Sequence, residues 1–167
     1  YYLIKNPTTT NQQIAEAIGV SLREARDIMS LLKNQTYIGE DGRITAKGYD
    51  VMEPYKVKNA IILAAGFSSR CAPLSYERPK GLFVIKGEIL IERQIRQLLD
   101  KGITNIYVVV GYKKELFFYL EKKYGIKIII NTEYMTRNNL SSIYAAREQF
   151  GNSYICYSDN YLNVNGY

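Results

Sequence analysis

The sequence predicts an α/β fold for the larger part of the chain, built on a mostly parallel sheet and preceded by a small, mainly helical domain. After residue 58, short apolar runs rich in β-branched residues alternate with segments of helical period, a pattern typical of a parallel sheet covered by helices. Before residue 54, a first helix is followed by helix, turn, helix, hairpin and a closing helix. We therefore expect one domain at 1–54 and a second at 58–167, joined by a short linker.

Turn and cap residues divide the first domain into helices. Asn6-Pro7 ends a first helix, and Thr10 or Asn11 caps a second. Ser21 and Glu24 form a capping box that begins a third helix. The predicted apolar face of this third helix consists of Leu22, Ala25, Ile28, Met29 and Leu32.

A small hairpin follows over residues 37–45, with Asp41-Gly42 at its tip, and 46–52 is a closing helix. This order, with QQIAEAIGVSLREARDIMSLL as its core, resembles a winged helix-turn-helix domain. The resemblance implies DNA binding, but residues 1–57 carry seven basic and seven acidic side chains. DNA affinity comes largely from neutralisation of phosphates by basic side chains, and this domain has no excess of them. We therefore favour a regulatory, scaffolding or dimerising role, in which the chain could form a homodimer.

The second domain alternates strands and helices. Its main predicted strands cover residues 59–65, 106–110, 127–131 and 154–157, with a short apolar run at 82–85. Its predicted helices cover residues 88–101, 113–124 and 141–150. Ligands of such sheets bind beyond the carboxyl ends of the strands, and both the loop after the first strand and the SDN at 158–160 fall at that edge.

The segment IILAAGFSSR at 61–70, followed by RPKGL at 78–82, predicts a phosphate site. A buried strand ends in small residues, which let an anion approach the backbone closely. Ser68 and Ser69 then offer hydroxyls, Arg70 a guanidinium fork and Lys80 a mobile point charge. The segment matches neither GxxxxGK[ST] nor GxGxxG.

The chain contains no histidine, which excludes histidine acid–base catalysis and histidine-ligated zinc. A metal would have to be a hard cation on carboxylate and phosphate oxygens, which indicates Mg²⁺. Asp159, at the end of an apolar strand, is the candidate ligand, and a turn residue is the alternative. Since residues 1–57 are neutral, the net charge of +6 lies in the second domain, which suits an anionic substrate.

These motifs resemble the signature of the sugar-nucleotide pyrophosphorylase and cytidylyltransferase superfamily, LAAGxGxR followed by a spacer and PK. The chain has Ser68 where many members have glycine, and Tyr157 where many have the first acid of a D-x-D. The resemblance implies a Rossmann-like sheet of the nucleotidyltransferase type. It also implies nucleotide binding by the first strand and its loop, at Leu63, Ala64, Ala65, Gly66, Ser68 and Ser69.

NTEYMTRNNLSSIYAAR at 131–147 places polar residues at a helix start, where they could contact a base or ribose or simply cap the helix. These residues are Asn138, Asn139, Ser141 and Ser142. RNNLSSIYAAR, with SDNY downstream, resembles bacterial choline-phosphate cytidylyltransferases. That resemblance implies transfer of CMP from CTP to phosphocholine with release of pyrophosphate, using Arg70 and Lys80 as catalytic residues and Asp159 as the Mg²⁺ ligand.

The resemblance covers 58–162, and family members continue with more sheet and a second metal-binding acid, so we expect this chain to hold the N-terminal part of the catalytic domain. Two alternatives stay open: a hexose-1-phosphate nucleotidyltransferase using UTP or dTTP, and a DNA-binding regulator whose second domain senses a nucleotide. No apolar run approaches the ~20 residues of a membrane span. Two cysteines make no disulfide framework, which indicates a cytoplasmic protein.

Overall fold

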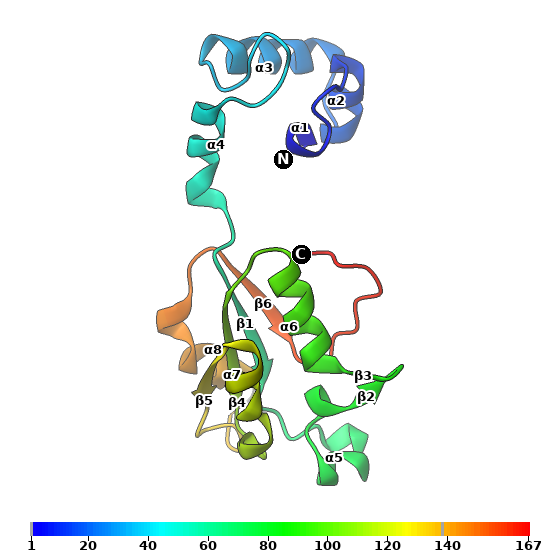
Figure 1. The fold of residues 1–167 in the computed structure, drawn as a ribbon, viewed down its shortest axis with the longest axis vertical. Helices are drawn as coiled ribbons and strands as arrows, with labels where there is room; N and C mark the ends of the chain where they lie inside the picture. The colour runs from blue at the N-terminus through cyan, green and yellow to red at the C-terminus, as the bar shows by residue number, and fades with distance from the viewer. Residues whose placement is uncertain (1, 138) are drawn as a thin grey trace. The chain divides into compact units, whose positions relative to one another are not determined.

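The computed structural model describes residues 2–137 and 139–167, which form two compact units with their boundary in the chain between Lys56 and Val57 (Figure 1). The first unit is helical. Its helices are α1 (Tyr2–Lys5), α2 (Asn11–Ile18), α3 (Leu22–Asn34) and α4 (Ala46–Met52), followed by the 3₁₀ turn η1 (Glu53–Tyr55). No helix in the described part of the chain is long and apolar enough to cross a membrane.

Reciprocal hydrogen bonds begin α2 and α3 where the sequence predicts them. Thr10 and Gln13 form a capping box at α2, and Ser21 and Glu24 form another at α3. Gly19 ends α2 with a φ of 72°, a left-handed conformation that glycine adopts without steric cost. These helix boundaries therefore follow from local sequence.

The first unit has a small core, whose buried apolar residues are Ile14, Ala15, Ala25 and Ile38. The prediction that Ile28 belongs to the buried face of α3 is wrong, since Ile28 is 38% exposed. A helix turns by about 100° per residue, and α3 directs Ala25 rather than Ile28 into this core. The predicted hairpin is a single antiparallel bridge between Ile38 and Ile44, so the winged-helix assignment stays a prediction.

A four-stranded parallel sheet organises the second unit. Its strands, in spatial order, are β5 (Lys127–Ile130), β4 (Asn105–Val110), β1 (Asn59–Ala64) and β6 (Ser153–Tyr157). All six residues of β1 are buried, because this central strand is paired on both sides and covered on both faces. The predicted α/β fold with a mostly parallel sheet is confirmed.

Helices cover both faces of this sheet (Figure 1). On one face, α6 (Leu90–Asp100) and α7 (Tyr119–Tyr124) pack against Ala60 and Ile62. On the other, α8 (Asn139–Ala145) packs against Ile61 and Leu63. Successive side chains of β1 thus alternate between two apolar clusters, as the two-residue period of a strand requires.

Several predicted elements are shorter than expected. The predicted helix at 88–101 begins at Leu90, because β2 (Val84–Ile85) and β3 (Glu88–Ile89) pair as an antiparallel hairpin. The helix predicted at 113–124 is split into the 3₁₀ turn η4 (Lys114–Phe117) and α7, and the one predicted at 141–150 into α8 and η5 (Arg147–Gln149). The loop region adds η2 (Ser69–Cys71), α5 (Leu74–Glu77) and η3 (Lys80–Leu82).

Candidate functional site

A cavity of about 350 Å³ opens at the carboxyl ends of β1 and β6. Four segments far apart in the sequence form its wall: the loop after β1, the start of η3, the start of α8 and the turn after β6. The lining residues are Leu63, Ala64, Ala65, Gly66, Ser68, Ser69, Arg70, Cys71, Pro79, Lys80, Gly81, Asn139, Ser142, Tyr157, Ser158 and Asp159. The sheet therefore brings both predicted motifs and the predicted carboxylate to one edge.

Of the residues predicted to bind nucleotide, phosphate or metal, Ser141 is the one outside this wall. Its side chain is 5% exposed, and its Oγ accepts a hydrogen bond of 2.9 Å from Nδ2 of Asn131. Ser141 thus fastens α8 to the sheet, while Ser142 and Asn139 line the cavity. Asn138, also singled out in the sequence, lies outside the described residues.

The loop after β1 has the open backbone that an anion needs. A Cβ atom placed on Gly66 would meet no atom within 4 Å, so a ligand can approach the chain there. Ser68 adopts a φ of 56° and a ψ of 43°, a left-handed conformation. Glycine adopts such angles readily, whereas a residue with a Cβ does so at a cost of roughly 1–2 kcal/mol.

Lys80 and Asp159 form an ion pair across the cavity, with 2.5 Å between Nζ and Oδ2. Both side chains are partly exposed, at 40% and 31%. The hydrogen bond to Asp159 raises the pKa of Lys80 above its ordinary value, so the amine is a cation at neutral pH. An entering phosphate would compete for Lys80, and an entering cation would compete for Asp159.

Close contact between Gly81 and Ser158 holds these two groups together. A Cβ atom on Gly81 would lie 2.8 Å from both the Cβ and the Oγ of Ser158, closer than a side chain can be accommodated. Glycine therefore allows η3 to pack against the turn after β6. Sequence reasoning did not assign a role to Gly81 or Ser158, although each is adjacent to a predicted residue, and that adjacency was the available signal.

Asn131 is a further residue that sequence reasoning missed. It follows β5 and is 3% exposed, and its Nδ2 donates to Ser141 and Ser142 at 2.9 and 3.0 Å. Its Oδ1 accepts from the backbone N–H of Glu133 at 2.9 Å. Asn131 thereby fixes the start of α8, including Ser142 of the cavity wall. The sequence signals were its place at the end of a predicted strand and at the start of the segment 131–147.

Known proteins resemble this chain in sequence and in fold. The MobA-like NTP transferase domain family matches residues 60–159. The chain is 45% identical over 106 residues to choline-phosphate cytidylyltransferase of Streptococcus pneumoniae, covering 64% of this chain and 46% of that protein. It is 47% identical over 104 residues to 2-aminoethylphosphonate cytidylyltransferase of Lancefieldella rimae, covering 60% and 42%.

A solved structure, CTP:phosphocholine cytidylyltransferase from Streptococcus pneumoniae, superposes with a TM-score of 0.64 at 45% identity. The match covers 65% of this chain and 48% of that chain. A nucleotidyl transferase from Methanothermobacter superposes with a TM-score of 0.50 at 20% identity, which shows likeness of fold alone. The chain spans just under half the length of these cytidylyltransferases.

Proposed function

The chain belongs to the family of MobA-like NTP transferase domains, and on that premise we propose that it transfers CMP from CTP to phosphocholine or a similar phosphate monoester. The products are CDP-choline, or its analogue, and pyrophosphate. The proposal rests on one observation: Leu63 to Gly66, Lys80 and Asp159 all line the same cavity. Both relatives named above are cytidylyltransferases with different acceptors, so their similarity supports the CTP donor more strongly than the acceptor.

In the proposed reaction, an oxygen of the acceptor phosphate attacks the α-phosphorus of CTP in line. The bond from that phosphorus to the β-phosphate oxygen breaks, and the electron pair leaves with pyrophosphate. A phosphate monoester is largely ionised near pH 7 because its second pKa is about 6, so the absence of histidine is no obstacle. The protein contributes positioning and charge stabilisation.

The cationic side chains have separate tasks in this proposal. Arg70 and the backbone N–H groups of the loop bind the β- and γ-phosphates. Lys80 leaves Asp159 and contacts the α-phosphate or the acceptor phosphate, where negative charge accumulates during transfer. Leu63 to Gly66, Asn139 and Ser142 lie against the nucleoside. Ser141 and Ser142 both accept hydrogen bonds from Asn131, which holds α8 in place.

Asp159 would hold Mg²⁺. Within residues 2–137 and 139–167 no group of three or more acidic, cysteine or histidine side chains could hold a metal. A single carboxylate nevertheless fits Mg²⁺, which commonly binds one or two carboxylates together with substrate phosphates and water. When bound, the ion neutralises charge on the phosphates.

Both cysteines are free, and we propose a cytoplasmic location on that basis.

Thermal-shift screening tests the donor. We expect CTP with Mg²⁺ to raise the melting temperature of the second unit more than UTP, dTTP, ATP or GTP does, because bound ligand stabilises the folded state. A preference for UTP or dTTP would support the hexose-1-phosphate alternative instead. No shift with any nucleotide at millimolar concentration would contradict the proposal.

The Lys80→Ala variant tests the chemistry. Removing a group that stabilises transition-state charge typically costs about 100-fold or more in turnover, so pyrophosphate release should fall by that factor while circular dichroism stays unchanged. Lys101→Ala is the matched control, since Lys101 is exposed and lies between α6 and β4, at the opposite edge of the sheet. Turnover like that of the wild type in Lys80→Ala would contradict the assigned role.

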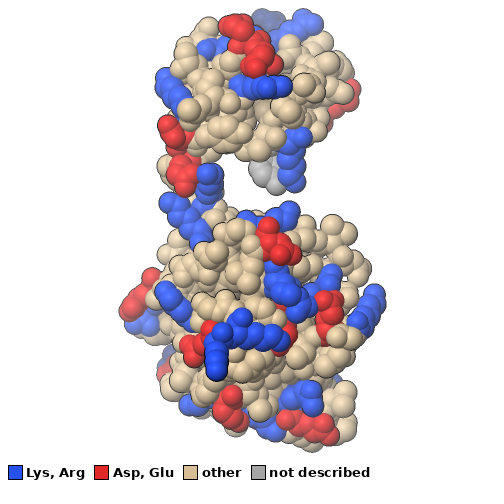
Figure 2. All heavy atoms as spheres, in the orientation of Figure 1, with Lys and Arg blue, Asp and Glu red and all other residues tan. Residues whose placement is uncertain are grey.

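DNA binding by the first unit is not part of this proposal. Figure 2 shows acidic and basic side chains interspersed on the visible face of that unit, rather than gathered into one basic patch. The exposed positions of α3 also mix signs, with Glu24 and Asp27 beside Arg23 and Arg26. A steep loss of DNA affinity between low and moderate salt would overturn this view.

A further inference from the structure

The turn after β4 contacts the loop that lines the cavity. The backbone N–H of Tyr112 donates to the carbonyl oxygen of Ala65 at 3.1 Å. The ring of Tyr112 meets the ring of Phe67 edge-on, with 4.6 Å between centroids, in the favourable range for aromatic pairs. Tyr112 therefore supports the loop after β1 through both its backbone and its side chain.

Lys113, the next residue, contacts the other half of the site. Its Nζ donates to the carbonyl oxygens of Tyr76 and Glu77, at 2.5 and 3.0 Å. These are the last two residues of α5, and the final carbonyls of a helix have no partner within the helix. The ammonium group supplies that missing partner from a different part of the chain.

The position of α5 limits where Lys80 can reach. Lys80 lies three residues beyond Glu77, and the intervening Pro79 has a restricted φ. A fixed end of α5 therefore restricts the start of η3, which delivers the Lys80 ammonium to the cavity. If α5 were released, Lys80 would sample more positions and contact a phosphate less often.

The backbone of Lys113 is strained. Its φ is 48°, a left-handed value that costs a residue with a Cβ roughly 1–2 kcal/mol. Such conformations persist only where the surroundings enforce them, and they are concentrated at functional sites. Glycine would relieve the strain but would lack the ammonium group that donates to the end of α5.

We propose that Lys113 is a positioning residue for Lys80, acting through the end of α5. Lys113 is absent from the described residues that line the nucleotide cavity, so its effect on a ligand must pass through another group. The inference rests on the proposed function, because it assigns the benefit to a nucleotide bound by Lys80.

Nucleotide affinity in four proteins tests this coupling. Calorimetry with CTP and Mg²⁺ would compare the wild type, Lys113→Met, Lys80→Ala and the double variant. We expect Lys113→Met to weaken binding about fivefold in the wild type and less than about twofold in the Lys80→Ala background, since residues that act through one another are not additive. Equal losses in both backgrounds, or no loss in either, would overturn the proposal.

Lys114→Met is the matched control, because it removes the same charge from the neighbouring position. In the described part of the chain, Lys113 makes hydrogen bonds to α5, whereas Lys114 makes no hydrogen bond or ion pair with it. It should bind CTP like the wild type, and Lys113→Arg should restore most of the affinity. If Lys114→Met lost as much CTP affinity as Lys113→Met, the loss would come from the removed positive charge alone, which would overturn the proposal.

Hydrogen exchange gives a readout that needs no nucleotide. We expect the amides of residues 74–82 to exchange faster in Lys113→Met than in the wild type, with unchanged exchange in Lys114→Met. Unchanged exchange in Lys113→Met would overturn the role of Lys113 whatever the affinities are. If the wild type binds no CTP, the proposed function fails, and the exchange result alone decides whether Lys113 holds α5.

Discussion

Individual side chains of this site act through partners on other elements. Lys80 pairs with Asp159, and Asn131 donates to Ser141 and Ser142. Without histidine, the site relies on fixed cations and hydrogen-bond donors whose value depends on their position. The residues that maintain that position, Asn131 foremost, are then as important as those that touch the ligand.

Asn131→Ala should lower both stability and nucleotide affinity. The change removes two buried hydrogen bonds to serines and a partly buried one from a backbone N–H. Leaving such groups unpaired costs about 2 kcal/mol, which thermal unfolding would detect. CTP affinity should fall as well, because Ser142 loses its support. Asn163→Ala, at an exposed position, is the control, and an unchanged melting temperature in Asn131→Ala would contradict the prediction.

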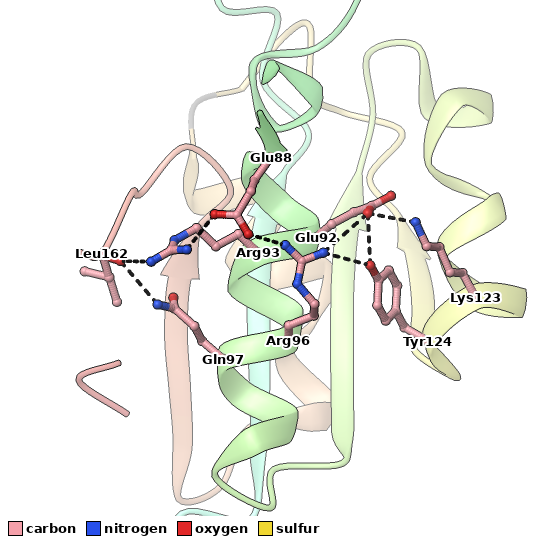
Figure 3. A network of polar contacts seen from close by, with 8 residues as sticks. All are labelled: Glu88, Glu92, Arg93, Arg96, Gln97, Lys123, Tyr124 and Leu162. Carbon is pink, nitrogen blue, oxygen red and sulfur yellow. Dashed lines mark hydrogen bonds and ion pairs between the residues drawn. The ribbon is translucent and has the colours of Figure 1, made fainter. Parts of the chain in front are cut away.

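At the level of secondary-structure elements, α6 connects α7 and the C-terminal segment (Figure 3). Glu92 of α6 is 5% exposed and accepts hydrogen bonds from Tyr119, Lys123 and Tyr124, at 2.7, 2.8 and 2.9 Å. On its other side, α6 reaches the carbonyl oxygen of Leu162 through Arg93 and Gln97. The buried carboxylate of Glu92 therefore joins α6 to α7, two helices that cover one face of the sheet.

The network predicts the pH dependence of stability. Burial opposes the charge of Glu92, but the hydrogen bonds from Lys123, Tyr119 and Tyr124 outweigh it and lower the pKa of this carboxyl below its ordinary value of 4.5. Since the pKa is lower in the folded state, the carboxylate stabilises the fold above pH 4.5, and this contribution disappears as pH falls through the folded-state pKa.

Glu92→Gln tests this sign. We expect its free energy of unfolding to be about 2 kcal/mol below that of the wild type at pH 7, because charged hydrogen bonds are replaced by weaker ones. The difference should shrink as the pH falls below 4.5. Chemical denaturation at several pH values measures it, with the exposed Glu115→Gln as control. A difference that grows toward low pH would contradict the sign.

For the molecule as a whole, every residue to which the proposal gives a role lies in the second unit. The sheet, both apolar clusters around it and the cavity are formed by residues after Lys56. The charge is divided in the same way, since residues 1–57 are neutral and the net charge of +6 lies beyond them. The roles of the first unit in regulation, dimerisation or scaffolding stay predictions.

Removing residues 1–56 should therefore leave nucleotide binding intact. We expect the fragment 57–167 to fold and to bind CTP within about twofold of the full chain, because the core and the cavity lose no residue. Calorimetry on both proteins measures this, with circular dichroism to check folding. A folded fragment with at least tenfold weaker affinity would contradict the prediction and assign the first unit to the site.

Local sequence was enough for the helix caps, the central strand and the composition of the phosphate loop. Capping boxes, β-branched runs and small-residue loops act within a few residues, so their signals are readable without a fold. The same reasoning placed Ile28 wrongly, because a period identifies a face of α3 but does not show how far the neighbouring helix covers it.

Contacts between distant segments required the folded chain. Strand order β5-β4-β1-β6 brings Asp159 to Lys80, 79 residues away. The folded chain also brings Lys113 to the end of α5, 36 and 37 residues away from its two carbonyl partners. No hydrophobic period encodes which strand neighbours which. The candidate residues of the site can therefore be predicted from the sequence, whereas the residues that they contact are decided by long-range packing.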